Sequence, residues 1–306
     1  MMGTSYTVKV SRLPEGIDGA RLGEKISAVL EQINAQMSTY LADSELSRIN
    51  RNPSTDWQPV SRPLYRVLLE AQRISRLTGG AFDITVGPLV NLWGFGPAAM
   101  QFEPPAEDLI EEQLNLVGYR HLQLREEPVS VRKAIAGLYL DLSALAKGYA
   151  VDQVAELLEQ QGITDYMVEL GGEIRLRGSN LSGKPWRIAV EKPTPEKRMI
   201  QRVLSITDVA MATSGDYRNF FEFDGRRFSH TIDPRTGRPI EHRLASVTIL
   251  RQTSMEADAL ATAMMVLGPE QGYQLAEKEK IAALFIIKDA DGFVEKSTSA
   301  FQQYLR

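Results

Sequence analysis

The sequence predicts an α+β fold, with mixed but largely antiparallel sheets and helices packed against them. Segments with the apolar spacing of helices alternate with short runs in which apolar and polar residues alternate, as in antiparallel strands. No G-x-G-x-x-G pattern follows a predicted strand, which disfavours a doubly wound, dinucleotide-binding sheet. No composition break or fixed-period repeat divides the chain. We therefore expect a single domain over residues 1–306, with two interlocked subdomains as the alternative.

The first half of the chain is predicted to open with a strand at 6–10 and a helix over Ala20–Met37, followed by a polar loop at 37–50. The next helix covers Arg62–Thr78 and ends at Gly79-Gly80, a common signal at a helix C-terminus. The elements after it are irregular structure around a short strand or helix at 81–96, a proline-rich surface loop at 97–107, a helix near 107–117, and strands near 121–125 and 129–140.

In the second half, a helix over 141–162 is predicted to begin with Ser143 as its N-cap and to stop at Gly162. Two strands over 166–178 turn at Gly171-Gly172, and 186–193 continues their sheet. The remaining predicted elements are strands at 200–206, 226–231, 244–250, 282–287 and 293–296, with a helix over 254–268.

Composition and charge exclude several classes of protein. The formal net charge is −4 and no basic stripe with interleaved aromatics occurs, so a nucleic-acid partner is not expected. The absence of cysteine excludes disulfides and cysteine-ligated metals, and the three scattered histidines disfavour a zinc site. No apolar run is long enough to span a membrane.

The helix predicted over 254–268 carries two oxygen-bearing side chains among its apolar residues. Asp258 and Thr262 are four residues apart, which places both on one face of a helix. A carboxylate and a hydroxyl together form a hard oxygen pair that suits Mg²⁺ or Ca²⁺. The alternative is that Asp258 stabilises the helix N-terminus while Thr262 bonds back to a carbonyl.

Two turns carry further candidate residues. The segment RFSHTIDPRTGRPIEHR, 227–243, brings histidines, arginines and Asp233 together around Pro234 and Gly237, which suits phosphate binding or proton transfer, or simply a solvated turn. The segment at 212–223 is either a simple turn or a turn whose backbone N–H groups bind phosphate. A third motif, GSNLSGKP at 178–185, ends in Pro185 where a P-loop needs a hydroxyl, so we interpret it as a polar hairpin.

Asp83 is a lone acid within the apolar, glycine-rich run GGAFDITVGPLVNLWGFG. A buried carboxylate requires a partner, which is either a ligand N–H or a backbone amide. The residue alone does not distinguish the two.

Taken in order along the chain, eight segments resemble the ApbE family of Mg²⁺-dependent FAD:protein FMN transferases. The segments are MGTSYTV, MSTYLADSELSRIN, GGAFDITVGPLVNLWGFG, DLSALAKGYAVD, VELGGEIRLRG, ATSGDYRNFFE, SHTIDPRTGRPI and EADALATAMMVLG. The resemblance covers almost the whole chain from Met2 onward and implies an ApbE-like fold. It also implies transfer of FMN from FAD to a threonine or serine hydroxyl of an acceptor protein, with release of AMP.

The resemblance also implies the residues of the site. The metal ligands would be Asp258, Thr262 and the backbone carbonyl of Ala144. His230 is the candidate for proton transfer, with a nearby carboxylate as the alternative. The implied contacts to FAD are Met2, Tyr40, Ala81, Phe82, Asp83, Asp141, Lys147 and Ile232, of which the two aromatic rings would offer stacking faces.

The partners and location implied by the resemblance are those of a periplasmic protein. The acceptor would carry an Asp-Gly-Ala-Thr/Ser-type motif, as in subunits of sodium-translocating NADH:quinone reductase or related redox complexes. The full-length precursor would be an inner-membrane lipoprotein, attached only through a lipid anchor that this sequence lacks. Two other functions remain open on sequence: FAD pyrophosphatase, giving FMN and AMP, and a non-catalytic flavin-binding protein.

Overall fold

The computed structural model describes residues 3–97, 103–194, 199–217, 219–290 and 292–305. The chain divides into two units, each assembled from segments that are separate in the sequence. Unit 1 comprises Met1–Asn34, Leu145–Tyr217 and Arg243–Arg306, and unit 2 comprises Ala35–Ala144 and Arg218–His242.

Unit 1 is organised around a seven-stranded sheet in the order β1-β5-β6-β9-β14-β15-β16, in which every pair is antiparallel. Its strands are β1 (Tyr6–Val10), β5 (Tyr166–Leu170), β6 (Glu173–Arg177), β9 (Val209–Gly215), β14 (Leu244–Arg251), β15 (Ala282–Asp289) and β16 (Gly292–Ser297). The hairpin between β5 and β6 pairs Leu170 with Glu173, because Gly171 and Gly172 adopt the positive φ values of +63° and +106° that the turn requires.

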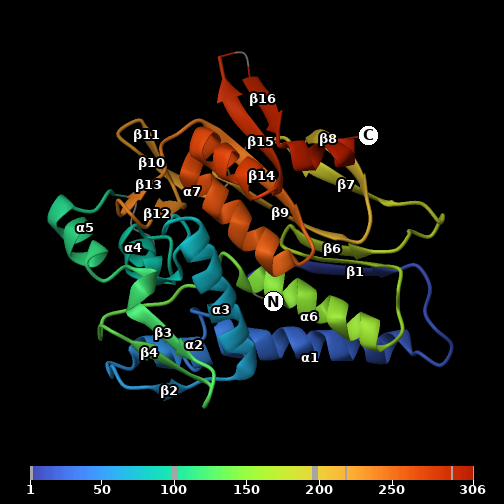
Figure 1. Cartoon of the computed structure of the whole chain (residues 1–306), viewed down its shortest axis with the longest axis horizontal. Helices are drawn as coiled ribbons and strands as arrows, with labels where there is room; N and C mark the ends of the chain where they lie inside the picture. The colour runs from blue at the N-terminus through green and yellow to red at the C-terminus, as the bar shows by residue number, and fades with distance from the viewer. Residues whose placement is uncertain (1–2, 98–102, 195–198, 218, 291, 306) are drawn as a thin grey trace. The chain divides into compact units, whose positions relative to one another are not determined.

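The two faces of this sheet are covered by different elements (Figure 1). On one face α6 (Ala146–Gln160) packs on β5 and β6, and α7 (Ser254–Lys278) packs on β9 and β14. On the other face, β7 (Trp186–Glu191), β8 (Ile200–Ile206) and η3 (Ser299–Leu305) enclose a hydrophobic core with β6, β9 and β15. Because side chains alternate along a strand, Ile174 and Leu176 of β6 enter this core while Glu173 and Arg175 face α6.

The first helix of unit 1 is α1 (Gly19–Met37), whose last residues belong to unit 2. Its buried residues Leu22, Ile26, Leu30 and Ile33 follow helical spacing, as the sequence predicts. The long helix α7 contains a break at Gly268, where φ is +78°, so the predicted end of the helix at 268 corresponds to a kink.

Unit 2 consists of short helices and three small sheets. The helices are α2 (Glu45–Arg51), α3 (Arg62–Leu77), η1 (Ile84–Val86), α4 (Gly87–Leu92), α5 (Glu107–Leu114) and η2 (Tyr119–His121). In the first sheet, β4 (Ser130–Lys133) lies between β2 (Gln58–Pro59) and β3 (Leu122–Arg125) and pairs with both. The other two sheets pair β10 (Phe220–Phe223) with β11 (Arg226–Ser229), and β12 (Ile232–Asp233) with β13 (Arg238–Pro239).

The core of unit 2 contains Trp93, which stacks on Phe228 and donates its indole N–H to the carbonyl of Gly237 at 2.8 Å. A second internal contact ties β4 to α2. The ammonium of Lys133, which is fully buried, donates to the carbonyls of Ile49 and Ala136.

Four predicted elements are wrong in detail. The segment at 37–50 is not only a loop, because Ser44 caps α2 within it. The predicted strand 129–140 ends at Lys133, and β7 pairs with β8 instead of continuing the main sheet. Ser143 does not cap α6, because the helix begins at Ala146 and the Ser143 N–H donates to Asp141.

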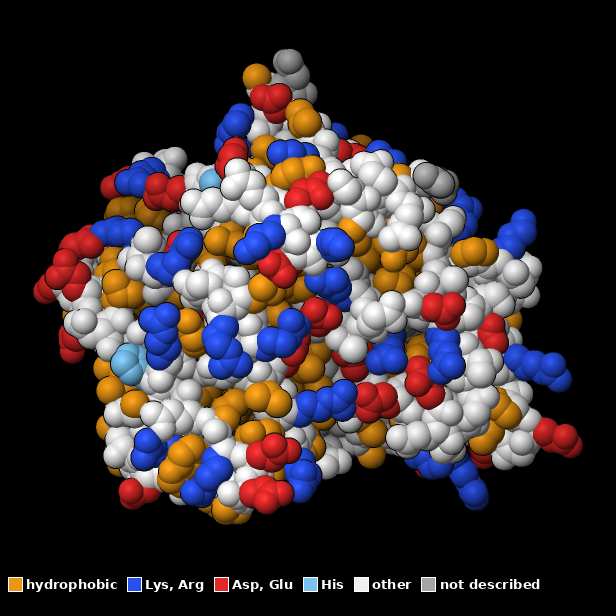
Figure 2. Space-filling model, viewed as in Figure 1, with side chains coloured by type: hydrophobic (Ala, Val, Ile, Leu, Met, Phe, Trp, Pro, Cys, Tyr) orange, Lys and Arg blue, Asp and Glu red, His pale blue; other side chains and the backbone are white. Residues whose placement is uncertain are grey.

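Other predictions are confirmed, including the strands at 6–10 and 200–206 and the helix that ends before Gly79. The proline-rich loop falls partly on residues 98–102, outside the described part of the chain. Within the described ranges, no helix is both long and apolar enough to cross a membrane. On the face drawn in Figure 2, lysine and arginine side chains are interspersed with acidic ones.

Candidate functional site

Side chains from α6, α7, β6 and β9 form a polar cluster in unit 1. Asp258 on α7 is 3% exposed, and its Oδ2 accepts a hydrogen bond from the backbone N–H of Gly148 at 3.1 Å. Thr262 follows one turn later, with its hydroxyl 3.3 Å from the hydroxyl of Ser214 on β9. The structure therefore gives Asp258 a partner on α6, instead of the N-terminus of its own helix.

Lys147 and Glu173 complete this cluster. The Lys147 ammonium donates to Oε1 of Glu173 at 2.5 Å, and the Glu173 side chain is 4% exposed. The second oxygen, Oε2, is buried and has no hydrogen-bond partner among the described residues. A buried acceptor without a donor is costly, so this atom needs an explanation.

Sequence reasoning missed Glu173, although a signal was present. In EIRLR the residues Glu173, Arg175 and Arg177 alternate with core residues, so one face of a buried strand is fully charged. Such a face must meet opposite charges, and α6 supplies them through Lys147, Asp152 and Glu159.

The pKa values of the cluster are linked through its charges. Burial, followed by the charge of Asp258, raises the pKa of Glu173 to about 8, although Lys147 acts in the opposite direction. Burial also raises the pKa of Asp258, against the favourable effects of Lys147 and the Gly148 N–H. Burial would lower the pKa of Lys147, but the charges of Asp258 and Glu173 raise it, so Lys147 remains an ammonium ion.

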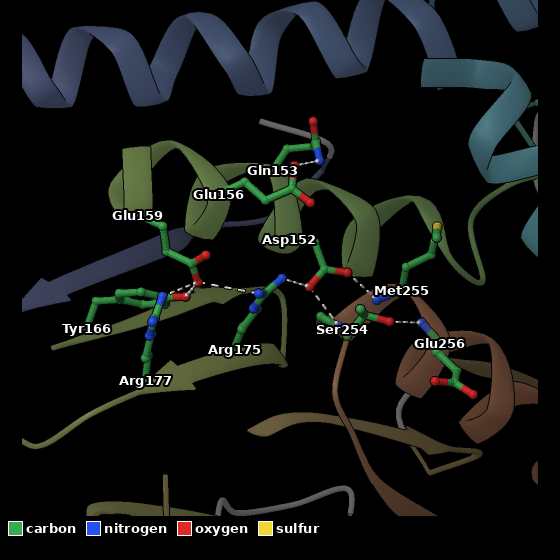
Figure 3. Close-up of polar contacts among 11 residues, drawn as sticks. Asp152, Gln153, Glu156, Glu159, Tyr166, Arg175, Arg177, Ser254, Met255 and Glu256 are labelled. Atoms are coloured by element: carbon green, nitrogen blue, oxygen red, sulfur yellow. Dashed lines mark hydrogen bonds and ion pairs between the residues drawn. The ribbon is translucent and has the colours of Figure 1, made fainter. Parts of the chain in front are cut away.

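The start of α7 is held by α6 through a second set of polar contacts (Figure 3). The carboxylate of Asp152 accepts the backbone N–H groups of Ser254 and Met255, both at 2.9 Å. It also accepts a hydrogen bond from the guanidinium of Arg175 at 3.0 Å. The two helices are therefore joined by hydrogen bonds in both directions. Asp152 of α6 accepts from the backbone at the start of α7, and Asp258 of α7 accepts from the backbone of Gly148 in α6.

The oxygen atoms of the cluster are of the kind that hard divalent cations prefer. In the described part of the chain, no group of three or more histidine or acidic side chains could hold a metal. A cation here would depend on the Asp258 carboxylate, the Thr262 hydroxyl and a backbone carbonyl. This all-oxygen set suits Mg²⁺, which takes few protein ligands and keeps several waters. The unpartnered Glu173 Oε2 is a ready acceptor for such water.

In unit 2, both carboxylate oxygens of Asp83 accept hydrogen bonds from residues of the same unit. Its Oδ1 accepts the backbone N–H of Thr85 at 2.8 Å and the hydroxyl of the same residue at 2.7 Å, and its Oδ2 accepts the Tyr119 N–H at 2.6 Å. Burial raises its pKa although these hydrogen bonds favour the charged form. The structure thus supports the backbone-amide alternative for the side chain, and a contact of this residue with FAD stays a prediction.

His230, in the predicted turn over 227–243, has a defined tautomer. Nδ1 of His230 lies 2.9 Å from the carbonyl oxygen of Asn219, which can only accept, so Nδ1 carries the proton in the neutral ring. Nε2 is then the basic nitrogen. The arginines of the turn are engaged, because Arg235 pairs with Asp233 and Arg238 with Glu107. These pairs weaken the interpretation of the turn as a phosphate site.

The remaining predicted contacts to FAD differ in exposure. Tyr40 is 71% exposed and offers a ring face, whereas Phe82 is 2% exposed and does not. Ala81 and Ile232 are also buried, and Asp141 is half-buried. Ala144, whose carbonyl is predicted to bind the metal, is half-buried as well. Met2 lies outside the described residues. In the segment 212–223, the predicted phosphate-binding residues Thr213, Ser214 and Gly215 are part of β9 and pair with β14, so their backbone is not a phosphate-binding turn.

A pocket of about 600 Å³ lies elsewhere in unit 1, lined by Glu159, Arg175, Arg177 and Asp208 among others. None of the predicted site residues lines it. Its two arginines both pair with Glu159, and Arg175 also pairs with Asp152, so two acids compensate the two positive charges.

The fold is that of the flavin transferases. A solved structure described as flavin transferase ApbE from Vibrio cholerae matches with a TM-score of 0.92 and 48% identity, covering 99% of this chain and 96% of that one. The apo form of Pseudomonas stutzeri flavinyl transferase ApbE matches with a TM-score of 0.91 and 41% identity. This match covers 100% of this chain and 94% of that one. In sequence, the FAD:protein FMN transferase of Vibrio cholerae serotype O1 is 49% identical, over 99% of this chain and 90% of its own length.

The family model described as the ApbE family matches residues 2–285. The chain belongs to the ApbE family. The family resemblance and the α+β fold expected from the sequence are thus confirmed.

Proposed function

We propose that the protein is an FAD:protein FMN transferase. The hydroxyl oxygen of an acceptor threonine or serine attacks the phosphorus of the FMN half of FAD, the pyrophosphate P–O bond breaks, and AMP leaves with the bridging oxygen. The hydroxyl proton passes to a base. The observation that carries the proposal is the polar cluster of the buried Asp258 with the half-buried Thr262 and Lys147, set in a chain that resembles enzymes of this name over nearly its full length.

The residues that would hold Mg²⁺ are Asp258, Thr262 and the backbone carbonyl of Ala144. When bound, the cation neutralises charge on the pyrophosphate and so favours departure of AMP. Lys147 adds a fixed positive charge, because Glu173 holds its ammonium in place. These roles rest on the fit of the donor set and on the family resemblance.

His230 is proposed to take the acceptor proton on Nε2, since its Nδ1 is directed to the Asn219 carbonyl. Tyr40 is proposed to stack on an aromatic ring of FAD through its exposed face. The other FAD contacts are proposed for Met2, Ala81, Phe82, Asp83, Asp141, Lys147 and Ile232. For the buried residues among them, the backbone is the part that could contact the ligand.

The acceptor is proposed to carry an Asp-Gly-Ala-Thr/Ser-type motif, as in subunits of sodium-translocating NADH:quinone reductase or related redox complexes. A periplasmic site of action, with a lipid anchor in the full-length precursor, is part of the same proposal. Both statements rest on the family resemblance.

The experiment that tests the function combines the protein with FAD, Mg²⁺ and an acceptor domain that carries the motif. Flavin fluorescence of the denatured acceptor band and release of AMP are measured together. A fluorescent acceptor that disappears with EDTA or with Asp258→Asn supports the transferase. The matched control is Glu270→Gln, an exposed acid on the same helix, which should retain transfer. Release of AMP and free FMN with a dark acceptor would indicate a pyrophosphatase, and no product would indicate a flavin carrier.

A further inference from the structure

One carboxylate oxygen of Glu173 is buried without a hydrogen-bond partner among the described residues. It is the first residue of β6, directly after the Gly171-Gly172 turn, and its side chain is 4% exposed. One oxygen accepts the Lys147 ammonium at 2.5 Å. The other is buried and accepts nothing from the described residues. Once Glu173 is ionised, this oxygen can only be satisfied by a donor, so the partner of the carboxylate must bring an O–H or N–H group.

The surroundings restrict what that donor can be. Lys147 donates to Glu173 at 2.5 Å, and the next residue, Gly148, donates its backbone N–H to Asp258 at 3.1 Å, so the two acids and one base form one cluster. The cluster carries a net charge of −1 when all three groups are ionised, and a divalent cation would reverse that sign. A pyrophosphate offers acceptors but no donors at neutral pH. Water bound to a cation offers donors, made stronger by the charge of the ion.

We infer that Glu173 is a positioning residue of the cation site, with one oxygen holding Lys147 and the other accepting a hydrogen bond from water carried by the cation at Asp258. The inference rests on the proposed function, because it requires a divalent cation at Asp258. It explains why a buried acid lies beside a buried acid, an arrangement that a purely structural role would make unfavourable. Partners of this kind orient a metal site without ligating the metal.

The inference predicts a loss of metal affinity that can be measured without FAD and without turnover. Mn²⁺ binding is followed by electron paramagnetic resonance of the free ion, in the wild-type protein and in Glu173→Gln. The substitution keeps the size of the side chain and one acceptor oxygen but removes the charge. We expect Mn²⁺ affinity to fall by about 10-fold or more, as is typical when a hydrogen-bond partner of a metal site is lost.

The matched control is Glu169→Gln. Glu169 belongs to the same hairpin and accepts the backbone N–H of Gly172 at 2.9 Å, but it pairs with neither Lys147 nor Asp258 in the described structure. The same charge is thus removed close to the same turn. We expect Mn²⁺ affinity within about twofold of the wild type, since Glu169 is only half-buried and solvent and salt screen its charge from an ion that it does not contact.

The outcomes separate this inference from the proposed function. If Glu173→Gln binds Mn²⁺ like the wild type while Asp258→Asn does not bind it, the inference is wrong and the cation site at Asp258 stands. If the wild type fails to bind Mn²⁺, both are overturned. Should Glu173→Gln not fold, Glu173→Asp replaces it. This variant keeps the charge but shortens the reach, so reduced affinity supports the inference and unchanged affinity contradicts it.

Discussion

At the scale of single residues, substitution of Thr262 tests whether its hydroxyl and the Asp258 carboxylate bind a cation together. Its hydroxyl lies beside that of Ser214, 3.3 Å away, on the face that also carries Asp258. Replacing Thr262 by Val keeps the shape and removes the oxygen, so we expect divalent-cation affinity to fall by about 10-fold and flavin transfer to fall with it. Isothermal titration with Mg²⁺ and the acceptor fluorescence assay measure both effects.

The control for that substitution is Thr262→Ser, which retains the hydroxyl and loses only a methyl group. We expect it to bind Mg²⁺ nearly as well as the wild type. Equal, strong Mg²⁺ binding by the Val and Ser variants would show that the hydroxyl is not a ligand.

Glu173 also makes stability depend on pH. Its pKa in the folded protein is raised to about 8 from an ordinary value of 4.5, so the folded state binds a proton more tightly than the unfolded state. The stabilisation is fully present below about pH 4.5 and is lost as the pH rises through about 8. Without divalent cation, the free energy of unfolding of the wild type should therefore fall more steeply over this range than that of Glu173→Gln.

Urea denaturation at a series of pH values, in EDTA, measures the difference. Each pKa unit corresponds to about 1.4 kcal/mol, so a change on the order of 2 kcal/mol or more between the two profiles is expected. Parallel profiles would show that Glu173 titrates in the folded protein as it does in the unfolded chain.

At the scale of elements, the contact between α6 and α7 depends on a glycine. A Cβ atom at Gly148 would lie 2.4 Å from the Ser254 carbonyl oxygen and 2.7 Å from the Met255 Cα. The backbone atoms of α7 cannot move aside cheaply, so Gly148→Ala should destabilise the protein by about 1–3 kcal/mol. Because the Gly148 N–H donates to Asp258, the variant should also lose Mg²⁺ affinity.

Gly23 in α1 is the matched control for that substitution. A Cβ atom there meets nothing within 4 Å, and its φ is not in the left-handed region. Gly23→Ala should therefore be neutral or stabilise the protein by about 0.4–1 kcal/mol. Chemical denaturation of both variants checks the pair. If Gly148→Ala proved as stable as Gly23→Ala, the close approach of α6 and α7 would not matter to folding.

At the scale of the whole molecule, the cation should act on one unit more than on the other. Asp258, Thr262, Lys147 and Glu173 all belong to unit 1. Binding stabilises the state that binds, by about 2.7 kcal/mol at a ligand concentration 100 times the Kd. Hydrogen exchange with Mg²⁺ alone should therefore slow in peptides of α6 and α7, and change little in peptides of α3 or β10. Equal slowing in both units would contradict this assignment.

Much of the fold could be predicted because local patterns agree with the final structure. The alternation in β1 and β8, the helical spacing in α1 and the glycines after α3 each specify their element without help from distant residues. Predictions failed where a hydrogen bond that the local pattern does not indicate decides the outcome. Ser143 looks like a helix cap, but Asp141 takes its N–H, and α6 begins only at Ala146. Similarly, α2 is too short to be stable alone, and its carbonyls are tied down by the buried Lys133.

By itself, the sequence determined the class of fold, the family, and the placing of Asp258 and Thr262 on one helical face, because these follow from order and spacing along the chain. Only the tertiary structure decided what those side chains meet. It paired Asp258 with Gly148, gave Asp83 partners within its own unit, buried Phe82, and brought Glu173 against Lys147 from 26 positions away. The physical reason is that burial and hydrogen bonding are properties of contacts between distant segments, and spacing along one segment does not encode them.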